Sequence, residues 1–397
     1  MSESCTSHTF QSVTGATAVL LPFELDAVIR DINEVRKKMI RERPETFTRD
    51  EWAYLLGFFS GSTMELAFRD TFGDRVTSAD LARCTRAARP RGTVSVWLPS
   101  NVSLLGPLCL SLLLVTGNRL LLKGASDADD LTGEFIRFLR RALPSGVLRT
   151  HLDTRVRYEI FDRHDPRSAE WSAAGDLRIV FGGDVSAASI DQLPHPLEST
   201  ALHFSDRRSE AWVSARDLSD EELSALVRVF AIYGQAGCTS PGSVVVLDGT
   251  QSDARMVRDR LAELWPRVLT EPIPEYAASA NVMAWQWCQA HDIDARLTEG
   301  HMAVLALADR IPLTTSFPRL LPVAAMSLDN AIERLPSNIQ TIGITSGALT
   351  SDALLRVLAL SNIRRVVPIR RMHHFSHQWD GRRFWSEAFS VIELPGA

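Results

Sequence analysis

The sequence predicts an α/β protein in which parallel sheets are covered by helices on both faces. Three observations support this class. Short apolar runs of strand type alternate with stretches of helical period across residues 93–204, and the alternation resumes after Cys238. The apolar runs are nearly continuous, which is typical of parallel strands buried on both faces. The length of 397 residues allows two or three domains with sizeable cores.

The chain should begin with helices. Residues 1–23 predict irregular structure or a short strand, and residues 25–41 predict a helix with one apolar face. Thr48 and Glu51 have the spacing of a capping box, in which two side chains pair with the free backbone N–H groups of a helix start. A second helix should therefore begin there.

The first sheet should lie between residues 91 and 204. Its expected strands are residues 93–98, 119–123, 155–161, 177–181 and 201–204. An apolar helix is expected over residues 104–115, with Gly117 just beyond its end. A further helix should cover residues 129–143, with Ser126 or Asp127 as its N-cap.

The second sheet should follow a hinge near residues 205–215. Ser219 should cap a helix that ends at residue 233, and further helices are expected at residues 252–265 and 326–335. The expected strands are residues 243–248, 320–325, 341–345 and 365–369. The chain should therefore form two α/β domains, residues 1–206 and 207–372, followed by a C-terminal segment, residues 373–397.

Composition and charge argue against several classes of function. A net charge of −5 gives no basic surface for nucleic acid. The apolar stretch of residues 103–115 is shorter than the roughly 20 residues that a membrane span needs, and we see no signal peptide. The five cysteines form no CxxC pair and no metal-type spacing, so we expect a cytoplasmic protein without a bound metal.

Cys238 is the strongest candidate for a catalytic residue. It lies in a loop, residues 233–243, that contains three glycines and a proline between an expected helix and an expected strand. A nucleophilic thiol needs access and donors that stabilise the thiolate, and a loop rich in backbone N–H groups can supply both. The alternative is a cysteine that only packs beneath the loop.

Three further signals surround this cysteine. Asn101 follows a strand, and ligands of open parallel sheets bind at the carboxyl ends of strands; the alternative is a simple helix cap. Lys123, one of three lysines in the chain, ends the next strand and suits a phosphate or ribose, unless it is a surface lysine. Gly182 and Gly183 precede a helix start that suits a nucleotide phosphate, although no GxGxxG motif occurs.

These signals, taken in order, resemble the aldehyde dehydrogenase superfamily. The shared pattern is Pro99-x-Asn101, a strand-end Lys123, Phe181-x-Gly183 and Gly234-Gln235-x-x-Cys238. Within the superfamily the chain is most similar to the LuxC-type, long-chain acyl-CoA reductases, particularly at Phe375 and Trp379-Asp380-Gly381. Residues 315–323 are similar to the superfamily's Glu-x-Phe-Gly-Pro stretch, and the resemblance covers roughly residues 90–385.

The resemblance implies an aldehyde dehydrogenase-like fold with a role for each domain. Residues 1–206 would form a Rossmann-like cofactor domain, residues 207–372 the catalytic domain, and residues 373–397 a segment that closes the active site or joins subunits. Cys238 would be the nucleophile, and Asn101 with the Cys238 backbone N–H would form the oxyanion hole. The residues expected to bind the nicotinamide cofactor are Leu98, Pro99, Ser100, Lys123, Gly124, Ser126, Gly182, Gly183 and Asp184.

The chain also departs from the superfamily pattern. One extra residue separates Gln235 from Cys238, and Thr315 replaces the glutamate that holds the nicotinamide ribose. Oxidising members have Glu-Leu-Gly-Gly where this chain has residues 203–206, so the water-activating glutamate is missing and Phe204 falls at or near its position. Asp206 or Glu210 is the alternative base.

The expected function is the reduction of an acyl thioester to the aldehyde. The acyl group would come from acyl-CoA, or from a carrier protein or synthetase, and the enzyme would be a homo-oligomer, a dimer or tetramer. We expect NADPH to be preferred or accepted, because Lys123 is near and Ser126 replaces the usual acid, although Asp127 follows it. The alternatives are an aldehyde-oxidising dehydrogenase and a non-catalytic subunit that docks a carrier protein.

Three histidines, His373, His374 and His377, have a spacing that invites a metal interpretation. Pro368 and the aromatic surroundings favour an extended segment instead, and no complete ligand set is nearby. We expect these histidines to line the entrance for the acyl group or carrier, with one of them protonating the departing thiol.

Overall fold

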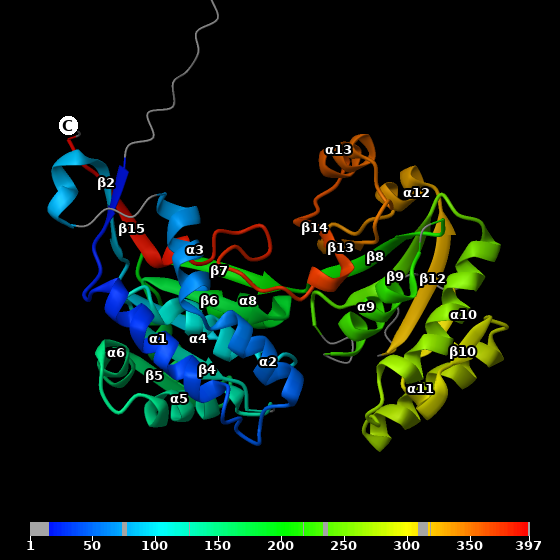
Figure 1. Cartoon of the computed structure of the whole chain (residues 1–397), viewed down its shortest axis with the longest axis horizontal. Coiled ribbons are helices and arrows are strands. Elements are labelled where there is room, and N and C mark those ends of the chain that lie inside the picture. Colours follow the sequence, from blue (N-terminus) through cyan, green and yellow to red (C-terminus); the bar gives the residue numbers. More distant parts are fainter. Residues whose placement is uncertain are drawn as a thin grey trace, which may run out of the picture.

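The structure is a computed structural model that describes residues 16–73, 78–126, 128–216, 218–232, 237–308, 317 and 319–395. The chain forms two lobes, each built around a sheet, and a small third sheet lies at the far end of the first lobe (Figure 1). Residues 233–236, Asp127 and Thr315, for which the sequence raised expectations, lie outside the described residues.

The first lobe contains a five-stranded sheet in which every neighbouring pair is parallel. Its order is β5 (Val156–Ile160), β4 (Arg119–Gly124), β3 (Thr93–Trp97), β6 (Leu177–Gly182) and β7 (Thr200–Ser205). All five expected strands are confirmed, with bounds that differ by one residue. The chain runs outward from β3 to β5 and then returns to place β6 on the other side of β3. The carboxyl ends of β3 and β6 therefore flank a switch point, where open α/β sheets bind ligands.

Helices cover both faces of this sheet. One face carries α1 (Leu25–Met39), α2 (Arg49–Phe58), α3 (Gly61–Phe72), α4 (Leu105–Leu114), α5 (Leu131–Ala142) and α6 (Val147–Arg155), and the other carries α7 (Arg167–Ala174) and α8 (Asp184–Asp191). The capping box of Thr48 and Glu51 is confirmed. The expected N-cap of α5 is wrong, because Asp130 caps that helix by accepting the Gly133 backbone N–H.

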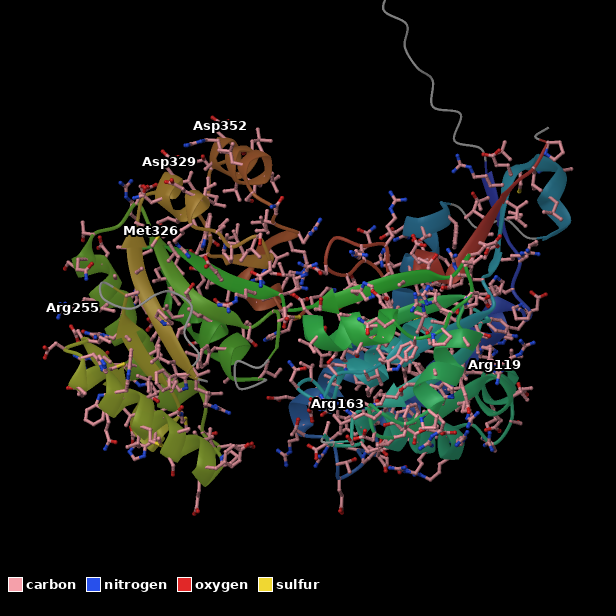
Figure 2. The ribbon with its side chains drawn as sticks, turned by 180° about the vertical axis from the view of Figure 1, so that it is seen from behind. Arg119, Arg163, Arg255, Met326, Asp329 and Asp352 are labelled. Atoms are coloured by element: carbon pink, nitrogen blue, oxygen red, sulfur yellow. The ribbon has the colours of Figure 1, made fainter. Side chains whose placement is uncertain are left out.

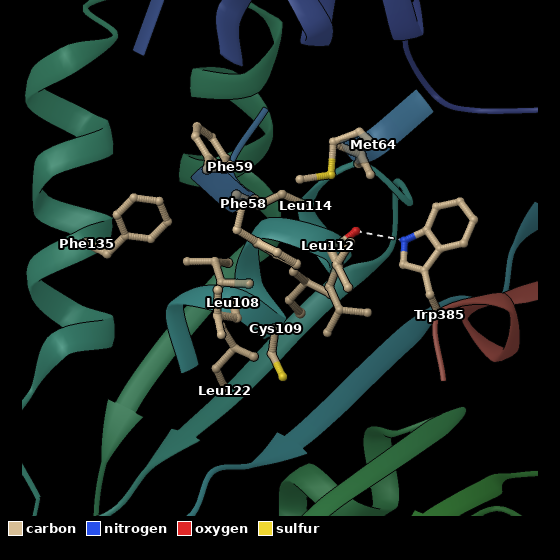
Figure 3. Close-up of a cluster of buried hydrophobic side chains, with 14 of the residues drawn as sticks. Phe58, Phe59, Met64, Leu108, Cys109, Leu112, Leu114, Leu122, Phe135 and Trp385 are labelled. Carbon is tan, nitrogen blue, oxygen red and sulfur yellow. Dashed lines mark hydrogen bonds between the residues drawn. The ribbon is translucent and has the colours of Figure 1, made fainter. Parts of the chain in front are cut away.

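The core of the first lobe gathers around α4, whose apolar residues are expected from the sequence (Figure 3). The indole N–H of Trp385 donates to the backbone carbonyl of Leu112 at 2.9 Å. The C-terminal segment is therefore anchored in this core. It continues as β15 (Phe389–Glu393), which pairs antiparallel with β2 (Cys84–Pro90), and β2 pairs in parallel with β1 (Ala16–Val19).

The second lobe contains a seven-stranded sheet, parallel except for its first strand. Its order is β10 (Ala295–Leu297), β11 (Val304–Leu307), β12 (Leu320–Met326), β9 (Pro241–Leu247), β8 (Arg208–Ser214), β13 (Ile339–Ile344) and β14 (Arg365–Pro368). The expected hinge near residues 205–215 is therefore too wide. β8 occupies most of that range. The sequence did not predict this strand because Ser209 and Glu210 make it look polar, although both residues are buried. Only Asp206 and Arg207 separate β7 from β8.

Helices also cover both faces of the second sheet. One face carries α9 (Asp220–Ala231) and α10 (Gln251–Val268), the other carries α12 (Leu328–Glu333) and α13 (Ser351–Leu360), and α11 (Glu275–Ala290) packs beside β10 and β11. The predicted N-cap Ser219 is confirmed and forms a capping box with Glu222. Short 3-10 helices are η1 (Ser78–Arg83), η2 (Glu299–His301), η3 (Ile369–Arg371) and η4 (Ser386–Ala388). Among the described helices, none has the length and apolar character needed to cross a membrane.

Candidate active site

A cavity of about 1290 Å³ lies where the two lobes meet. The first sheet contributes the residues that follow the carboxyl ends of its strands, such as Asn101 after β3 and Gly183 after β6. The second sheet contributes the opposite ends, with Ser209 at the start of β8 and Cys238 just before β9. This volume exceeds the roughly 300–1,000 Å³ of a typical small-ligand pocket.

The cavity brings together most of the residues that the sequence singled out. The residues of that set that line it are Leu98, Pro99, Ser100, Asn101, Lys123, Ser126, Gly182, Gly183 and Cys238. Gly124 and Asp184 do not line it. Gly124 pairs with Ile160 in the sheet, and Asp184 uses its carboxylate to accept the Ser205 hydroxyl. These two residues therefore have structural contacts in this fold, and their contacts with a cofactor stay predictions.

Cys238 belongs to the second lobe, yet its half-buried side chain packs against the core of the first. The Ser209 hydroxyl donates to the Cys238 backbone carbonyl at 2.7 Å, and the Ser240 N–H donates to the Gly237 carbonyl at 2.9 Å. The tight turn thus fixes the thiol at the junction of the lobes, beside the cavity. The sequence predicted this loop from its glycines, although residues 233–236 lie outside the described part.

The thiol of Cys238 is a weak acid in this environment. Burial raises its pKa to about 11, and the Asp380 carboxylate adds to the rise. The backbone N–H of Cys238, the Gln340 amide and the Arg365 guanidinium lower the pKa and offset part of that rise. The backbone N–H of the loop therefore stabilises the thiolate, as expected, but burial outweighs this effect, so catalysis by Cys238 calls for a proton acceptor.

We expect this raised pKa to appear in alkylation of the free protein by iodoacetamide. Only the thiolate reacts, and below the pKa its fraction rises about tenfold per pH unit, so the rate should climb from pH 7 towards pH 10. Mass spectrometry of the Cys238 peptide measures the rate, and the buried Cys84, Cys109 and Cys288 serve as internal controls. A rate that levels off below pH 8 would contradict the assignment.

The two carboxylates that the sequence offered as bases both have other partners. Glu210 is buried and accepts two hydrogen bonds from Arg334, at 2.9 and 2.7 Å, and one from the Trp212 indole at 3.0 Å. The Asp206 carboxylate accepts the backbone N–H of Asp184 at 2.8 Å and so caps α8. Glu210 is thus held by partners in the second lobe and Asp206 by α8 of the first, which disfavours both as a base for an attacking water.

Phe204 lines the cavity at the end of β7. Its ring stacks on Phe181 with centroids 4.8 Å apart and meets Phe384 edge-on at 6.2 Å. An aromatic wall therefore faces the ligand space near the end of β7. The sequence placed Phe204 at or near the position of the missing glutamate, and the structure has its side chain on the cavity wall.

The cationic side of the cavity lies at the carboxyl ends of β4 and β5. Lys123 is mostly buried, with its ammonium group 5.7 Å from the centre of the Phe161 ring. Arg163 and His164, in the loop after β5, line the same cavity and are exposed. Figure 2 shows Arg163 on the side of the first lobe that faces the second. The sequence reasoning missed Arg163, although its place just after a strand was a usable signal.

His373 lines the cavity but is committed to two hydrogen bonds. Its Nε2–H donates to the Val229 carbonyl at 2.6 Å, so Nδ1 accepts from the Thr239 hydroxyl at 2.6 Å. Burial lowers the pKa of His373 to about 4, which keeps the ring neutral. The Tyr54 hydroxyl fixes the same segment by donating to the His373 carbonyl and accepting the Phe375 N–H.

The expectation for the other two histidines is corrected. His374 and His377 do not line the cavity, and His377 lies 3.6 Å from Asp70 instead. The segment around these histidines is not extended throughout, because the 3-10 helix η3 lies just before them. Of the three histidines, only His373 lines the cavity. Within the described ranges no group of three or more His, Cys, Asp or Glu side chains is arranged to hold a metal ion.

Comparisons with known proteins place these features in context. A family model described as acyl-CoA reductase (LuxC) matches residues 74–387. A search of curated proteins gives no match.

Solved structures show the fold. Lactaldehyde dehydrogenase from Escherichia coli has a TM-score of 0.64 at 15% identity, covering 93% of this chain and 86% of that one. Aldehyde dehydrogenase 21 from Physcomitrella patens, solved with its product succinate, has a TM-score of 0.67 at 13% identity, covering 94% and 86%. An NAD-dependent aldehyde dehydrogenase from Sinorhizobium meliloti has a TM-score of 0.66 at 12% identity, covering 94% and 82%. The chain therefore has the aldehyde dehydrogenase fold, as the sequence predicted.

Proposed function

Because the chain belongs to the acyl-CoA reductase (LuxC) family, we propose that it reduces an acyl thioester to the aldehyde through an acyl-enzyme on Cys238, with NADPH. The protein is an oxidoreductase, and the resemblance on which the sequence reasoning relied is confirmed. The observation that carries the proposal is the placement of Cys238 on the same cavity as the switch point of the first sheet.

A nicotinamide cofactor fits the residues of this cavity. When bound, it supplies the hydride that converts the acyl carbon to an aldehyde carbon. The crevice between the ends of β3 and β6 offers Ser100 and the backbone of Gly182 and Gly183, and Lys123 and Arg163 offer positive charge for phosphate. The N-terminus of α8 fits a phosphate less well than expected, because Asp206 already accepts the Asp184 N–H there.

The remaining steps belong to the side chains around Cys238. Its sulfur attacks the acyl carbon, the bond to the donor sulfur breaks, and the donor thiol leaves with a proton. Asn101 and the Cys238 N–H are the proposed donors to the carbonyl oxygen as negative charge develops on it. Release of the aldehyde breaks the bond to Cys238, whose sulfur regains a proton.

We expect NADPH to be preferred over NADH, because Lys123 and Arg163 can pair with a 2′-phosphate and position 126 holds a serine. Arg163→Ala should raise the KM for NADPH roughly tenfold or more, as expected for the loss of one charge-assisted hydrogen bond. The KM for NADH should change little. Steady-state kinetics with both cofactors measures this, and Lys37→Ala, at an exposed ion-paired position on α1, is the control. Equal losses with both cofactors, or a preference of the unaltered protein for NADH, would overturn the assignment.

We further propose that the donor is acyl-CoA or an acyl group on a carrier protein or synthetase, and that the enzyme works in the cytoplasm as a dimer or tetramer. An exposed edge strand supports self-association, since β15 leaves Val391 and Ile392 partly exposed. Aldehyde release with NADPH from a panel of acyl-CoAs and acyl-proteins tests the reaction. Failure of every donor to release aldehyde would sink the proposal and favour a non-catalytic docking subunit.

A further inference from the structure

A buried polar cluster lies next to Cys238 and has no role in the steps described so far. Gln340, near the start of β13, is fully buried, and neither atom of its amide has a full hydrogen-bond partner among the described residues. Asp380 is 1% exposed; Oδ2 of its carboxylate accepts from Arg207 at 2.9 Å, while Oδ1 has no such partner there. Buried polar atoms of this kind are costly and call for a specific role.

A tight backbone turn fixes the position of Asp380. Trp379 and Arg382 exchange two backbone hydrogen bonds, at 3.0 and 2.8 Å, across a two-residue turn. Asp380 and Gly381 both have positive φ, +50° and +67°, which is the geometry that an Asp-Gly turn of this type requires. The turn is pinned against the second sheet, because Gly381 packs on the side chain of Arg364.

The same contacts join the turn to Gln340. The Arg364 backbone N–H donates to the Gln340 carbonyl at 3.1 Å, and the Arg365 guanidinium lies over the Trp379 ring at 5.3 Å. Gln340 and Asp380 are 40 residues apart in the chain, yet both lie close to the Cys238 loop. Thr341, next to Gln340, pairs with Ser209, whose hydroxyl donates to the Cys238 carbonyl. Arg207, the partner of Asp380, lines the same cavity as Cys238.

Both side chains act on the sulfur of Cys238, with opposite signs. The Asp380 carboxylate raises the pKa of the thiol, while the Gln340 amide lowers it. Burial raises the pKa of Asp380 itself, against the lowering effects of Arg207, Arg364 and Arg382. The Asp380 carboxylate is therefore more basic than an ordinary aspartate, because its pKa is raised.

No other described group near the thiol is as well suited to take its proton. Both ring nitrogens of His373 are engaged, and its pKa is lowered to about 4. Glu210 is held by Arg334 and Trp212, and Asp206 caps α8. Arg365 remains a cation and cannot accept a proton.

We propose that Asp380 accepts the proton of the Cys238 thiol and that Gln340 is the positioning residue that holds the sulfur. This inference rests on the proposed function. As the bond from Sγ to the acyl carbon forms, the thiol proton passes to Oδ1 of Asp380, directly or through one water. As the bond from the acyl carbon to the donor sulfur breaks, that proton passes to the departing sulfur, so Asp380 is again a carboxylate.

The Asp380→Asn variant tests the proposal, because a proton acceptor and a mere negative charge make opposite predictions. Removing the charge lowers the pKa of Cys238, so alkylation by iodoacetamide at pH 7 should become faster. Acylation of Cys238 by acyl-CoA without NADPH should nonetheless slow by roughly 10²-fold, the effect of losing a general base. The acid limb of the acylation pH profile, which reports ionisation of Asp380, should also disappear.

Two further variants keep the test decisive. Gln340→Met, similar in shape, should slow alkylation, because it removes a contact that lowers the pKa of the thiol. Glu387→Gln is the matched control, since Glu387 also belongs to the C-terminal segment and pairs with Arg91, but lies away from the cavity. It should leave alkylation and acylation unchanged.

The outcomes distinguish a wrong role for Asp380 from a wrong function for the protein. If Asp380→Asn is acylated as fast as the unaltered protein, or is alkylated no faster, the role of Asp380 is wrong while the acyl-enzyme stands. If the unaltered protein itself takes no acyl group from any donor, the proposed function fails. The assignment is supported if Asp380→Asn is acylated more slowly but alkylated faster than the unaltered protein, while Glu387→Gln matches the unaltered protein in both reactions.

Discussion

Replacing Cys238 by alanine should abolish aldehyde formation from every acyl donor, with a loss of roughly 10⁴-fold or more, as seen when a nucleophile is removed. The fold should survive, because the side chain is small and half-buried at the junction of the lobes, and the truncation costs about 1 kcal/mol of unfolding free energy. Trapping of released aldehyde measures the first effect, and thermal unfolding measures the second.

Cys288→Ala is the control for this experiment. Cys288 is buried in α11, which packs beside β10 and β11, and it does not line the cavity. Its loss should therefore cost some stability but leave the rate of turnover unchanged. Substantial aldehyde formation by Cys238→Ala would show that no acyl-enzyme forms on this residue. The thioester would then be reduced directly, and the proposal for Asp380 would lose its basis.

The acyl-enzyme should persist when NADPH is withheld. General-base help to an attacking water is worth roughly 10²–10⁴-fold in rate, and Glu210 and Asp206 are both held by other groups. Phe204 adds an apolar wall to the cavity. Intact-mass analysis should show one acyl group on Cys238 that is lost slowly, and NADPH should discharge it with stoichiometric aldehyde release.

The reverse direction gives the sharper form of this test. Offered an aldehyde and NADP⁺ without an acceptor thiol, the enzyme should form little free acid. Glu210→Gln and Asp206→Asn should lose the acyl group no faster and no slower than the unaltered protein. Rapid acid production that vanishes in one of these variants would identify a base and favour an aldehyde-oxidising enzyme.

The fold was predicted from local patterns in the sequence. The strands of the first sheet were predictable because each is an almost unbroken apolar run, a direct consequence of helices on both faces. β8 escaped because Glu210, paired with Arg334 from 124 residues away, makes a buried strand look polar. The cap of α5 was misplaced because several acidic residues precede that helix and only geometry selects Asp130.

The site was predictable to the extent that its residues follow strand ends or form a loop with glycines. Asn101, Lys123 and Cys238 share one cavity for that reason. The placement of Gln340 and Asp380 near the Cys238 loop was not predictable, because it depends on how distant segments of the chain pack together, which no local pattern indicates. The same holds for His373, whose partners Val229 and Thr239 come from a different part of the second lobe.

The C-terminal segment packs back onto the first lobe, and this affects how the protein folds during its synthesis on the ribosome. β2 is made early but pairs with β15, about 300 residues later in the chain, and Trp385 completes the core around α4. Domains generally fold in order as they are synthesised. The second lobe can therefore form, with Cys238 in place, before Asp380 and His373 have left the exit tunnel. At that stage Cys238 would lack the proton acceptor that we propose, so we expect the nascent chain to be acylated more slowly than the finished protein.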